Sequence, residues 1–268
     1  MITGIDHIII LVDDLSTAMR QYESVGFVVT RGGVHPGAGT ENALIPLADG
    51  SYLELLAVAD PVLAIHHPKW SHPDGTRRKG GEYGGFALST DDIDADVQRI
   101  AGGGLTMTPP ADGSRERPDG TMVRWRVSSP PQRELPFLIQ DVTPRDVRIA
   151  APPRGLGLHA AISEVRIAAA DLPVAVRAYS QLLDTPALGA APAAGEVHFL
   201  TPRGEITVLE HAAGNRIAGI LEITLGVADW RSATRELLPV LEHRPGGWQV
   251  PHHVLGGTRI LLRPKVGP

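Results

Sequence analysis

Cysteine is absent from the 268-residue sequence. Disulfide bonds, thiolate nucleophiles and cysteine metal ligands are therefore excluded together, and the cytosol is the default compartment. Long apolar runs are absent as well. The run at residues 8–12 is too short to cross a membrane or to form a signal peptide, and no basic flank precedes it. We therefore expect a soluble, cytoplasmic protein with no membrane partner.

Basic clusters and aromatic residues are scarce. The formal net charge is −5 at pH 7 and the one basic block is Arg77-Arg78-Lys79, so nucleic acid and anionic membranes are poor candidates for partners. Aromatic residues make up 4% of the chain, which weakens the case for a binding site built of aromatic faces. What the chain has instead is 30 glycines and 23 prolines, which suit many short strands joined by turns. Its length is sufficient for two well-packed domains.

One pattern recurs four times: an apolar strand, an aspartate and an amphipathic helix. In the first copy, residues 5–27, apolar side chains recur at helical spacing after the aspartate and stop at a glycine. The aspartates expected to cap the four helices are separated by 78, 79 and 58 residues; they are Asp14, Asp92, Asp171 and Asp229. Copies at such intervals indicate an internally duplicated protein.

Each copy continues into further strands. In the first, Asp49-Gly50 separates two apolar runs, residues 43–47 and 52–58, and predicts a tight hairpin. Residues 142–158 contain prolines and no apolar period, so we place a domain boundary there, between residues 1–150 and 151–268. The predicted modules are residues 5–60, 82–143, 160–212 and 218–264.

A strand with a leading histidine, paired aspartates, a helix and three strands with a glutamate in the last one resembles the βαβββ module of the vicinal oxygen chelate (VOC) superfamily. That superfamily includes glyoxalase I, extradiol dioxygenases and the bleomycin-resistance proteins. The tandem form, with PFLIQDVTPRD at residues 136–146 closing the first half, is most similar to the glyoxalase-like domain proteins. The resemblance implies an α+β fold of four βαβββ modules, arranged as two paired-module domains with curved mixed sheets.

By the same resemblance, a divalent metal lies in a cup of curved sheet, with ligands from the first and last strands of a module. His7 and Glu54 match these two positions, and an imidazole with a carboxylate suits Fe, Mn, Co, Ni or Zn. Glu54 is also the candidate catalytic proton acceptor. In the second module the first position is Gly85, and Gln140 is the nearest oxygen donor and the third candidate ligand. In the second half, Glu164 alternates with an arginine and is expected on a wet sheet face.

Three further side chains are candidate substrate contacts. Strand alternation places Tyr52 on the same face as Glu54. In the strand MVRWRVS, Arg124 and Arg126 share one face and Trp125 lies on the other. Arginines facing the cup would bind a carboxylate or enolate substrate. Arginines facing outward would leave Trp125 in the core, and this second orientation is slightly preferred.

Two functions follow from these residues. The first is a divalent-metal-dependent enzyme of lyase, isomerase or dioxygenase type, acting on a small molecule with adjacent oxygens. The alternative is a metal-free small-molecule binding or drug-sequestering protein, motivated by Gly85, with His7 as an ordinary core histidine. A homodimer is compatible with either. The loop that contains His66, His67 and His72 is expected to be a lid or binding loop rather than a separate metal site.

Overall fold

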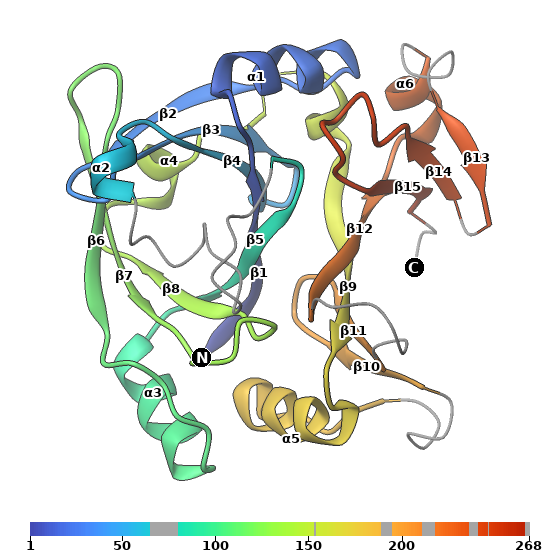
Figure 1. Ribbon diagram of the computed structural model, residues 1–268. Coiled ribbons are helices and arrows are strands. Elements are labelled where there is room, and N and C mark those ends of the chain that lie inside the picture. The colour runs from blue at the N-terminus through green and yellow to red at the C-terminus, as the bar shows by residue number, and fades with distance from the viewer. Residues whose placement is uncertain are drawn as a thin grey trace.

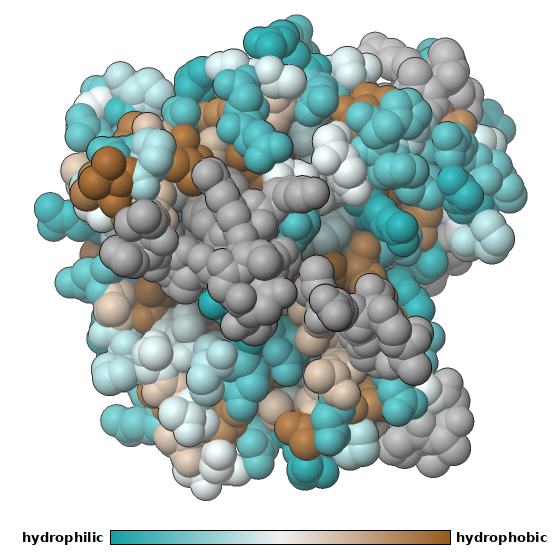
Figure 2. All heavy atoms as spheres, viewed as in Figure 1, coloured by the Kyte–Doolittle hydropathy of each residue, from teal (hydrophilic) through white to brown (hydrophobic). Residues whose placement is uncertain are grey.

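The computed structural model describes residues 1–64, 80–152, 154–188, 195–210, 218–235, 241–245 and 247–265. The predicted lid histidines lie outside the described residues. The chain forms a closed eight-stranded barrel followed by a seven-stranded sheet (Figure 1). On the face shown in Figure 2, hydrophobic residues are dispersed among hydrophilic ones. In the described parts of the chain, no helix has the length and apolar character needed to cross a membrane.

The barrel is built from two modules. The first consists of β1 (Ile2–Leu11), α1 (Leu15–Ser24), β2 (Thr30–His35), β3 (Thr40–Pro46), β4 (Tyr52–Val58) and the short α2 (Pro61–Ala64). The second consists of β5 (Tyr83–Thr90), α3 (Ile93–Gly102), β6 (Ala111–Glu116), β7 (Met122–Ser128), β8 (Phe137–Asp141) and α4 (Arg145–Arg148). Around the barrel the strand order is β1-β4-β3-β2-β6-β7-β8-β5, so the modules join at β1–β5 and at β2–β6.

The second half repeats this plan in an open sheet of order β10-β11-β9-β12-β15-β14-β13. Its first part contains η2 (Leu156–Leu158), β9 (Ala160–Ala169), α5 (Leu172–Leu183), β10 (Glu196–Leu200) and β11 (Glu205–Glu210). Its second part contains β12 (Gly219–Val227), α6 (Trp230–Thr234), β13 (Glu242–Arg244), β14 (Gly247–Val250) and β15 (Ile260–Pro264). The predicted α+β class with two curved sheets is confirmed.

The aspartate caps explain why α1, α3, α5 and α6 begin where they do. In each helix the side chain of the residue before the first turn accepts a hydrogen bond from a backbone N–H that has no partner within the helix. The four donors are the N–H groups of Thr17, Ala95, Val174 and Ser232, and the acceptors are Asp14, Asp92, Asp171 and Asp229. The repeated aspartate therefore marks a helix start in all four copies.

The two halves share one hydrophobic core. A single cluster of buried side chains includes Ile8 and Tyr22 from the barrel and Val165 and Tyr179 from the sheet. The Tyr179 hydroxyl also donates to the carbonyl oxygen of Glu134, 2.7 Å away in the first half. Each half therefore covers apolar surface of the other, and burial of that surface stabilises both.

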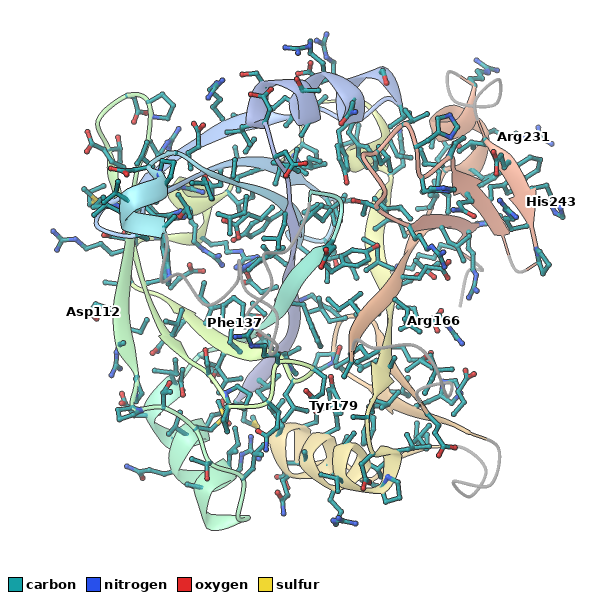
Figure 3. The ribbon with its side chains drawn as sticks, in the orientation of Figure 1. Asp112, Phe137, Arg166, Tyr179, Arg231 and His243 are labelled. Carbon is teal, nitrogen blue, oxygen red and sulfur yellow. The ribbon has the colours of Figure 1, made fainter. Side chains whose placement is uncertain are left out.

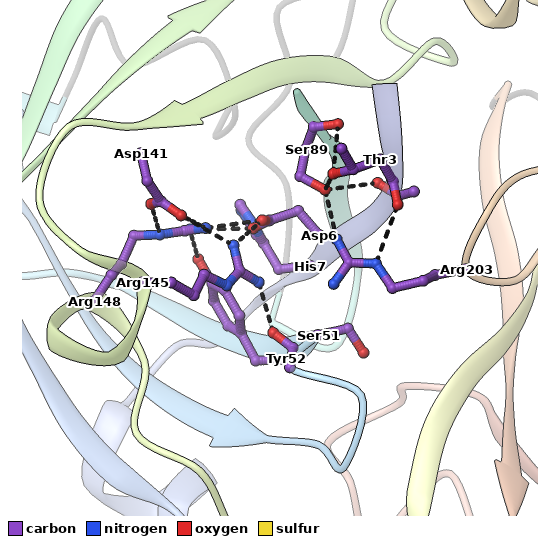
Figure 4. Close-up of polar contacts among 12 residues, drawn as sticks. Thr3, Asp6, His7, Ser51, Tyr52, Ser89, Asp141, Arg145, Arg148 and Arg203 are labelled. Atoms are coloured by element: carbon purple, nitrogen blue, oxygen red, sulfur yellow. Dashed lines mark hydrogen bonds and ion pairs between the residues drawn. The ribbon is translucent and has the colours of Figure 1, made fainter. Parts of the chain in front are cut away.

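Arg203 ties the second half to the start of β1. Its Nη2 donates to the Ser89 hydroxyl at 2.7 Å, and its Nε donates to the carbonyl oxygen of Thr3 at 3.2 Å (Figure 4). The Ile5 N–H donates in turn to the Arg203 carbonyl oxygen at 3.4 Å. These bonds fix the strand that carries Asp6 and His7 into the barrel.

The barrel closes where β2 meets β6, and the backbones approach so closely there that glycine is required. Gly33 has φ +137°, and a Cβ built on it would lie 1.8 Å from the carbonyl oxygen of Glu116. Since that oxygen belongs to the backbone, it cannot rotate away. We expect Gly33→Ala to lower the free energy of unfolding by about 2–4 kcal/mol, through strain and overlap together, in urea unfolding experiments.

The matched control is Gly120→Ala. Gly120 also has a positive φ, +81°, but a Cβ there would meet nothing within 4 Å. It should show only the conformational loss of about 1–2 kcal/mol. Equal losses in the two variants would mean that crowding at the barrel closure contributes nothing.

Candidate functional site

The barrel contains a cavity of about 420 Å³, within the range of small-molecule sites. Its lining is more polar on β1 to β4 and on β6 than on β7 and β8. Strands β1 to β4 contribute polar side chains, among them His7, His35, Asn42, Tyr52 and Glu54. Strands β7 and β8 contribute Trp125, Val127, Phe137 and Ile139; Phe137 lies within the ring of strands in Figure 3.

His7 and Glu54 meet inside this cavity because β1 and β4 are parallel neighbours. The register pairs His7 with Tyr52 and Ile9 with Glu54. The Nε2 atom of His7 lies 3.4 Å from Oε2 of Glu54, and the two side chains are 3% and 9% exposed. Tyr52 stacks on the His7 ring with centroids 4.6 Å apart, which fixes the ring plane. The structure therefore brings together three residues that the sequence singled out.

The other nitrogen of His7 is held by Asp6. Nδ1 lies 2.6 Å from Asp6 Oδ1, and the Asp6 carboxylate also receives N–H groups from Arg148 at 3.1 and 2.8 Å and from Arg145 (Figure 4). Burial by itself would raise the pKa of Asp6, but the Arg148 guanidinium and the His7 hydrogen bond hold it well below its usual range. Asp6 is therefore ionised, and Nδ1 carries the proton that it donates.

Glu54 is ionised as well. Its burial would raise the pKa, but His7, His35 and a hydrogen bond from Asn42 lower it below the ordinary value. Asn42 Nδ2 donates to Oε1 at 2.7 Å, and His35 Nε2 lies 3.9 Å from the same oxygen. His7 thus stands between two carboxylates. A metal ion placed between its Nε2 and Glu54 would contact both side chains.

The donor set fits a divalent metal in part. An imidazole and a carboxylate are suitable ligands, and a ligand histidine whose far nitrogen donates to a carboxylate is the usual supporting arrangement, here His7 with Asp6. In the described residues, however, no three His, Asp or Glu side chains are grouped so that they hold a metal ion. The protein would therefore supply two ligands, and a bound molecule or water would supply the others.

Gln140 does not reach this site. Its Nε2 donates to the carbonyl oxygen of Asp91 at 2.7 Å, and its Oε1 accepts from the N–H of Ile93 at 3.4 Å, at the start of α3. Ile139, the preceding residue of β8, is the one that lines the cavity. Strand alternation therefore places Gln140 outside the barrel, where it satisfies a helix terminus, and it cannot share an ion with His7.

Arg124 and Arg126 also lie outside the cavity. Arg126 pairs with Asp94 on α3, with Nη2 3.0 Å from Oδ1, and Arg124 is exposed. Trp125, between them, lines the cavity rather than the hydrophobic core. The outward orientation of the arginines is thus the observed one, and a role in binding substrate beside Glu54 does not agree with their placement.

The sequence analysis missed several polar residues of the cavity, among them His35, Asn42, Arg115 and Arg148. His35 is the last residue of TRGGVH, a glycine-rich segment whose sequence is typical of a loop. A lone histidine in such a segment could still have been noted as a candidate site residue. Arg148 belongs to the stretch predicted as a linker. Neither His35 nor Arg148 lies at a sequence spacing that relates it to Glu54, because their proximity depends on how the strands of the barrel pair.

A family model described as a glyoxalase-like domain matches residues 5–183 of this chain. The chain belongs to the glyoxalase-like domain family. The match covers the barrel from Ile5 onward and extends through β9 and α5 of the second half. Curated protein sequences yield no match.

Solved structures share the fold of this glyoxalase-like domain protein. A hypothetical protein from Staphylococcus aureus superposes with a TM-score of 0.70 at 14% identity, over 97% of this chain and 98% of that one. A mutant of 4-hydroxymandelate synthase from Streptomyces coelicolor gives a TM-score of 0.59 at 13% identity, over 92% and 79% of the two chains. At these identities the likeness concerns the fold alone. The family match confirms the predicted glyoxalase-like resemblance.

Proposed function

We propose that this glyoxalase-like domain protein is a divalent-metal-dependent enzyme that acts on a small molecule with two adjacent oxygens inside the barrel. The observation that supports this is the pairing of His7 Nε2 with the ionised Glu54, 3.4 Å apart in the cavity, while Asp6 fixes the other nitrogen of the ring. That arrangement presents a nitrogen lone pair and a carboxylate to one ion.

We assign a separate role to each side chain around His7 and Glu54. His7 and Glu54 would hold the metal, which when bound supplies a Lewis acid for the ligand oxygens. Asp6 keeps the His7 proton on Nδ1, and Asn42 orients the Glu54 carboxylate through its 2.7 Å hydrogen bond. Glu54 is ionised and can accept a proton from an acidic C–H or O–H of the bound molecule. Phe137 and the other apolar residues of β7 and β8 limit access of water.

Metal titration tests the proposal. Protein freed of metal by a chelator and then dialysed would be titrated calorimetrically with Mn²⁺, Co²⁺, Ni²⁺ and Zn²⁺. We expect one site per chain for at least one ion, and a loss of affinity of at least about a hundredfold in His7→Ala. His253→Ala is the control, because His253 is exposed in the second half. Absence of binding by the wild type, or equal binding by His7→Ala, would refute the proposal.

A metal-free binding protein is the second candidate function. It is favoured by the second module, where Gly85 stands at the position that matches His7 and β8 contributes only Phe137 and Ile139 to the cavity lining. In that case organic ligands should raise the melting temperature by the same amount with and without chelator, because only ligands of the folded state stabilise it. A ligand response that requires divalent metal would favour the enzyme instead.

A further inference from the structure

Arg115 is a buried cation of the cavity wall, and no ion pair balances it in the described residues. It lies on β6, lines the cavity and is 3% exposed. One N–H of Nη2 donates to the carbonyl oxygen of Arg148 at 2.7 Å, while Nε has no hydrogen-bond partner. Burial lowers the pKa of Arg115, and the nearby Tyr52 and Glu54 offset this only partly.

The other buried arginine of the cavity is different. Arg148 forms ion pairs with Asp6 and Asp141, so its charge is matched within the protein. A charged group taken out of water is costly unless it is paired. The unmatched guanidinium of Arg115 therefore points to a negative group that arrives with a ligand.

The fold makes room for this guanidinium through a glycine. A Cβ built on Gly32 would lie 2.9 Å from Arg115 Nη1 and 2.1 Å from Asn42 Oδ1. Asn42 Oδ1 is also buried and without a hydrogen-bond partner, although the same amide donates to Glu54. The guanidinium of Arg115 and the amide oxygen of Asn42 thus both lie beside Gly32, next to the proposed reaction centre, with hydrogen-bonding capacity that the protein does not use.

We infer that Arg115 binds a carboxylate of the ligand, so that the substrate is a small organic acid whose carboxylate is separate from the oxygen pair at His7 and Glu54. This rests on the proposed function for the position of the oxygen pair. Guanidinium N–H groups match a carboxylate in charge and geometry. A phosphate dianion would bring two charges to one guanidinium beside the ionised Glu54, which disfavours it. The rest of the ligand would contact Trp125 and Phe137.

A matched pair of probes tests this in the wild-type protein. Both 3,4-dihydroxybenzoate and 3,4-dihydroxybenzamide offer two adjacent oxygens on a ring of the same size, but only the first carries a carboxylate. In calorimetric titrations of the metal-loaded protein, we expect the acid to bind about tenfold to a hundredfold more tightly than the amide.

Variants assign the preference to Arg115. Arg115→Met should remove the difference between acid and amide by weakening only the acid, and Arg115→Lys should retain part of it. Arg177→Met removes an exposed charge on α5 and should leave both affinities unchanged. If the wild type binds acid and amide equally, the inference fails while the proposed function stands. If neither probe binds the metal-loaded protein, the inference fails, and the metal titration decides the proposed function. Should Arg115→Met not fold, the wild-type comparison still decides.

Discussion

Replacement of Asp6 by asparagine is expected to lower the free energy of unfolding at pH 7 by about 3–5 kcal/mol. Asp6 is fully buried and its two oxygens receive N–H groups from Arg148, Arg145 and His7. Asparagine has almost the same shape but no charge, so Arg148, which is itself buried, would lose its main counter-ion. Arg148 would keep only Asp141 as a counter-ion, and weakening the pairing of a buried charge is one of the few changes of this size that a single substitution produces.

The same carboxylate controls stability at acid pH. The pKa of Asp6 in the folded protein lies well below its ordinary value of 3.8. A group with a depressed folded pKa contributes stability above its unfolded pKa, and this contribution is lost as the pH falls through the folded pKa. The wild type should therefore lose stability progressively below about pH 4, and Asp6→Asn should lose less over that interval.

Urea unfolding at pH 7 and at several values between about pH 5 and 2 measures both effects. Asp94→Asn is the control, because Asp94 also pairs with an arginine, Arg126, but at the exposed surface. Its effect at pH 7 should be much smaller than that of Asp6→Asn. Similar losses in the two variants would mean that the buried network around Asp6 does not stabilise the fold.

The parts of the site that the sequence predicts are those specified by local patterns. The period-two alternation of β4 places Tyr52 and Glu54 in the cavity and Leu53 and Leu55 in the hydrophobic core. The aspartate after each apolar strand marks a helix start, because it satisfies a backbone donor within three residues. His7 follows from its position directly before the apolar run of residues 8–12, although β1 itself begins earlier, at Ile2.

The other residues of the site depend on contacts between strands that are distant in sequence. Asn42 and His35 reach Glu54 through the β3–β4 pairing and the turn between β2 and β3. Arg115 reaches the cavity because β6 closes the barrel against β2 at the Val34–Glu116 pair. The sequences of β2 and β6, TRGGVH and ADGSRE, have no apolar alternation, so they resemble loops until the register is known.

The misplacement of Gln140 in the site and of Trp125 in the hydrophobic core has one physical cause. On a strand, a shift of one residue moves a side chain from one face to the other. Gln140 follows Ile139 on β8, and Arg124 and Arg126 flank Trp125 on β7; in both strands the apolar residue faces the cavity. Apolar side chains inside a ligand cavity look the same in sequence as apolar side chains in a core.

The second half repeats the order of strands and helices of the first, but its Glu164 carboxylate is already bonded to protein groups and is not available to a ligand. Glu164, which corresponds to the first-strand position, is only 8% exposed and not on a wet face as expected. Its carboxylate accepts from Thr207 at 2.8 Å, Thr224 at 3.3 Å, Arg166 at 3.0 Å and Arg263 at 3.2 Å. Figure 3 shows Arg166 on this second sheet, apart from the barrel. With both oxygens occupied, this carboxylate serves stability, and the barrel is where ligand chemistry is expected.

Glu54→Gln is expected to reduce the affinity for divalent metal by about a thousandfold, more than the 10–100-fold that is typical when only a residue supporting a ligand is changed. Glutamine preserves the volume of the side chain and an oxygen that can accept from Asn42. It removes the negative charge that faces His7 Nε2 across 3.4 Å. The loss therefore measures the charge and not the packing.

Glu164→Gln is the matched control, since it makes the same substitution at a carboxylate that is also poorly exposed but bonded to four protein groups in the second half. It should reduce stability and leave the metal affinity unchanged, whereas Glu54→Gln should reduce the metal affinity. Both variants would be titrated calorimetrically with the ion that binds the wild type most tightly. If Glu54→Gln bound that ion as well as the wild type does, the ion would have to lie elsewhere. The metal-free binding function would then explain the cavity.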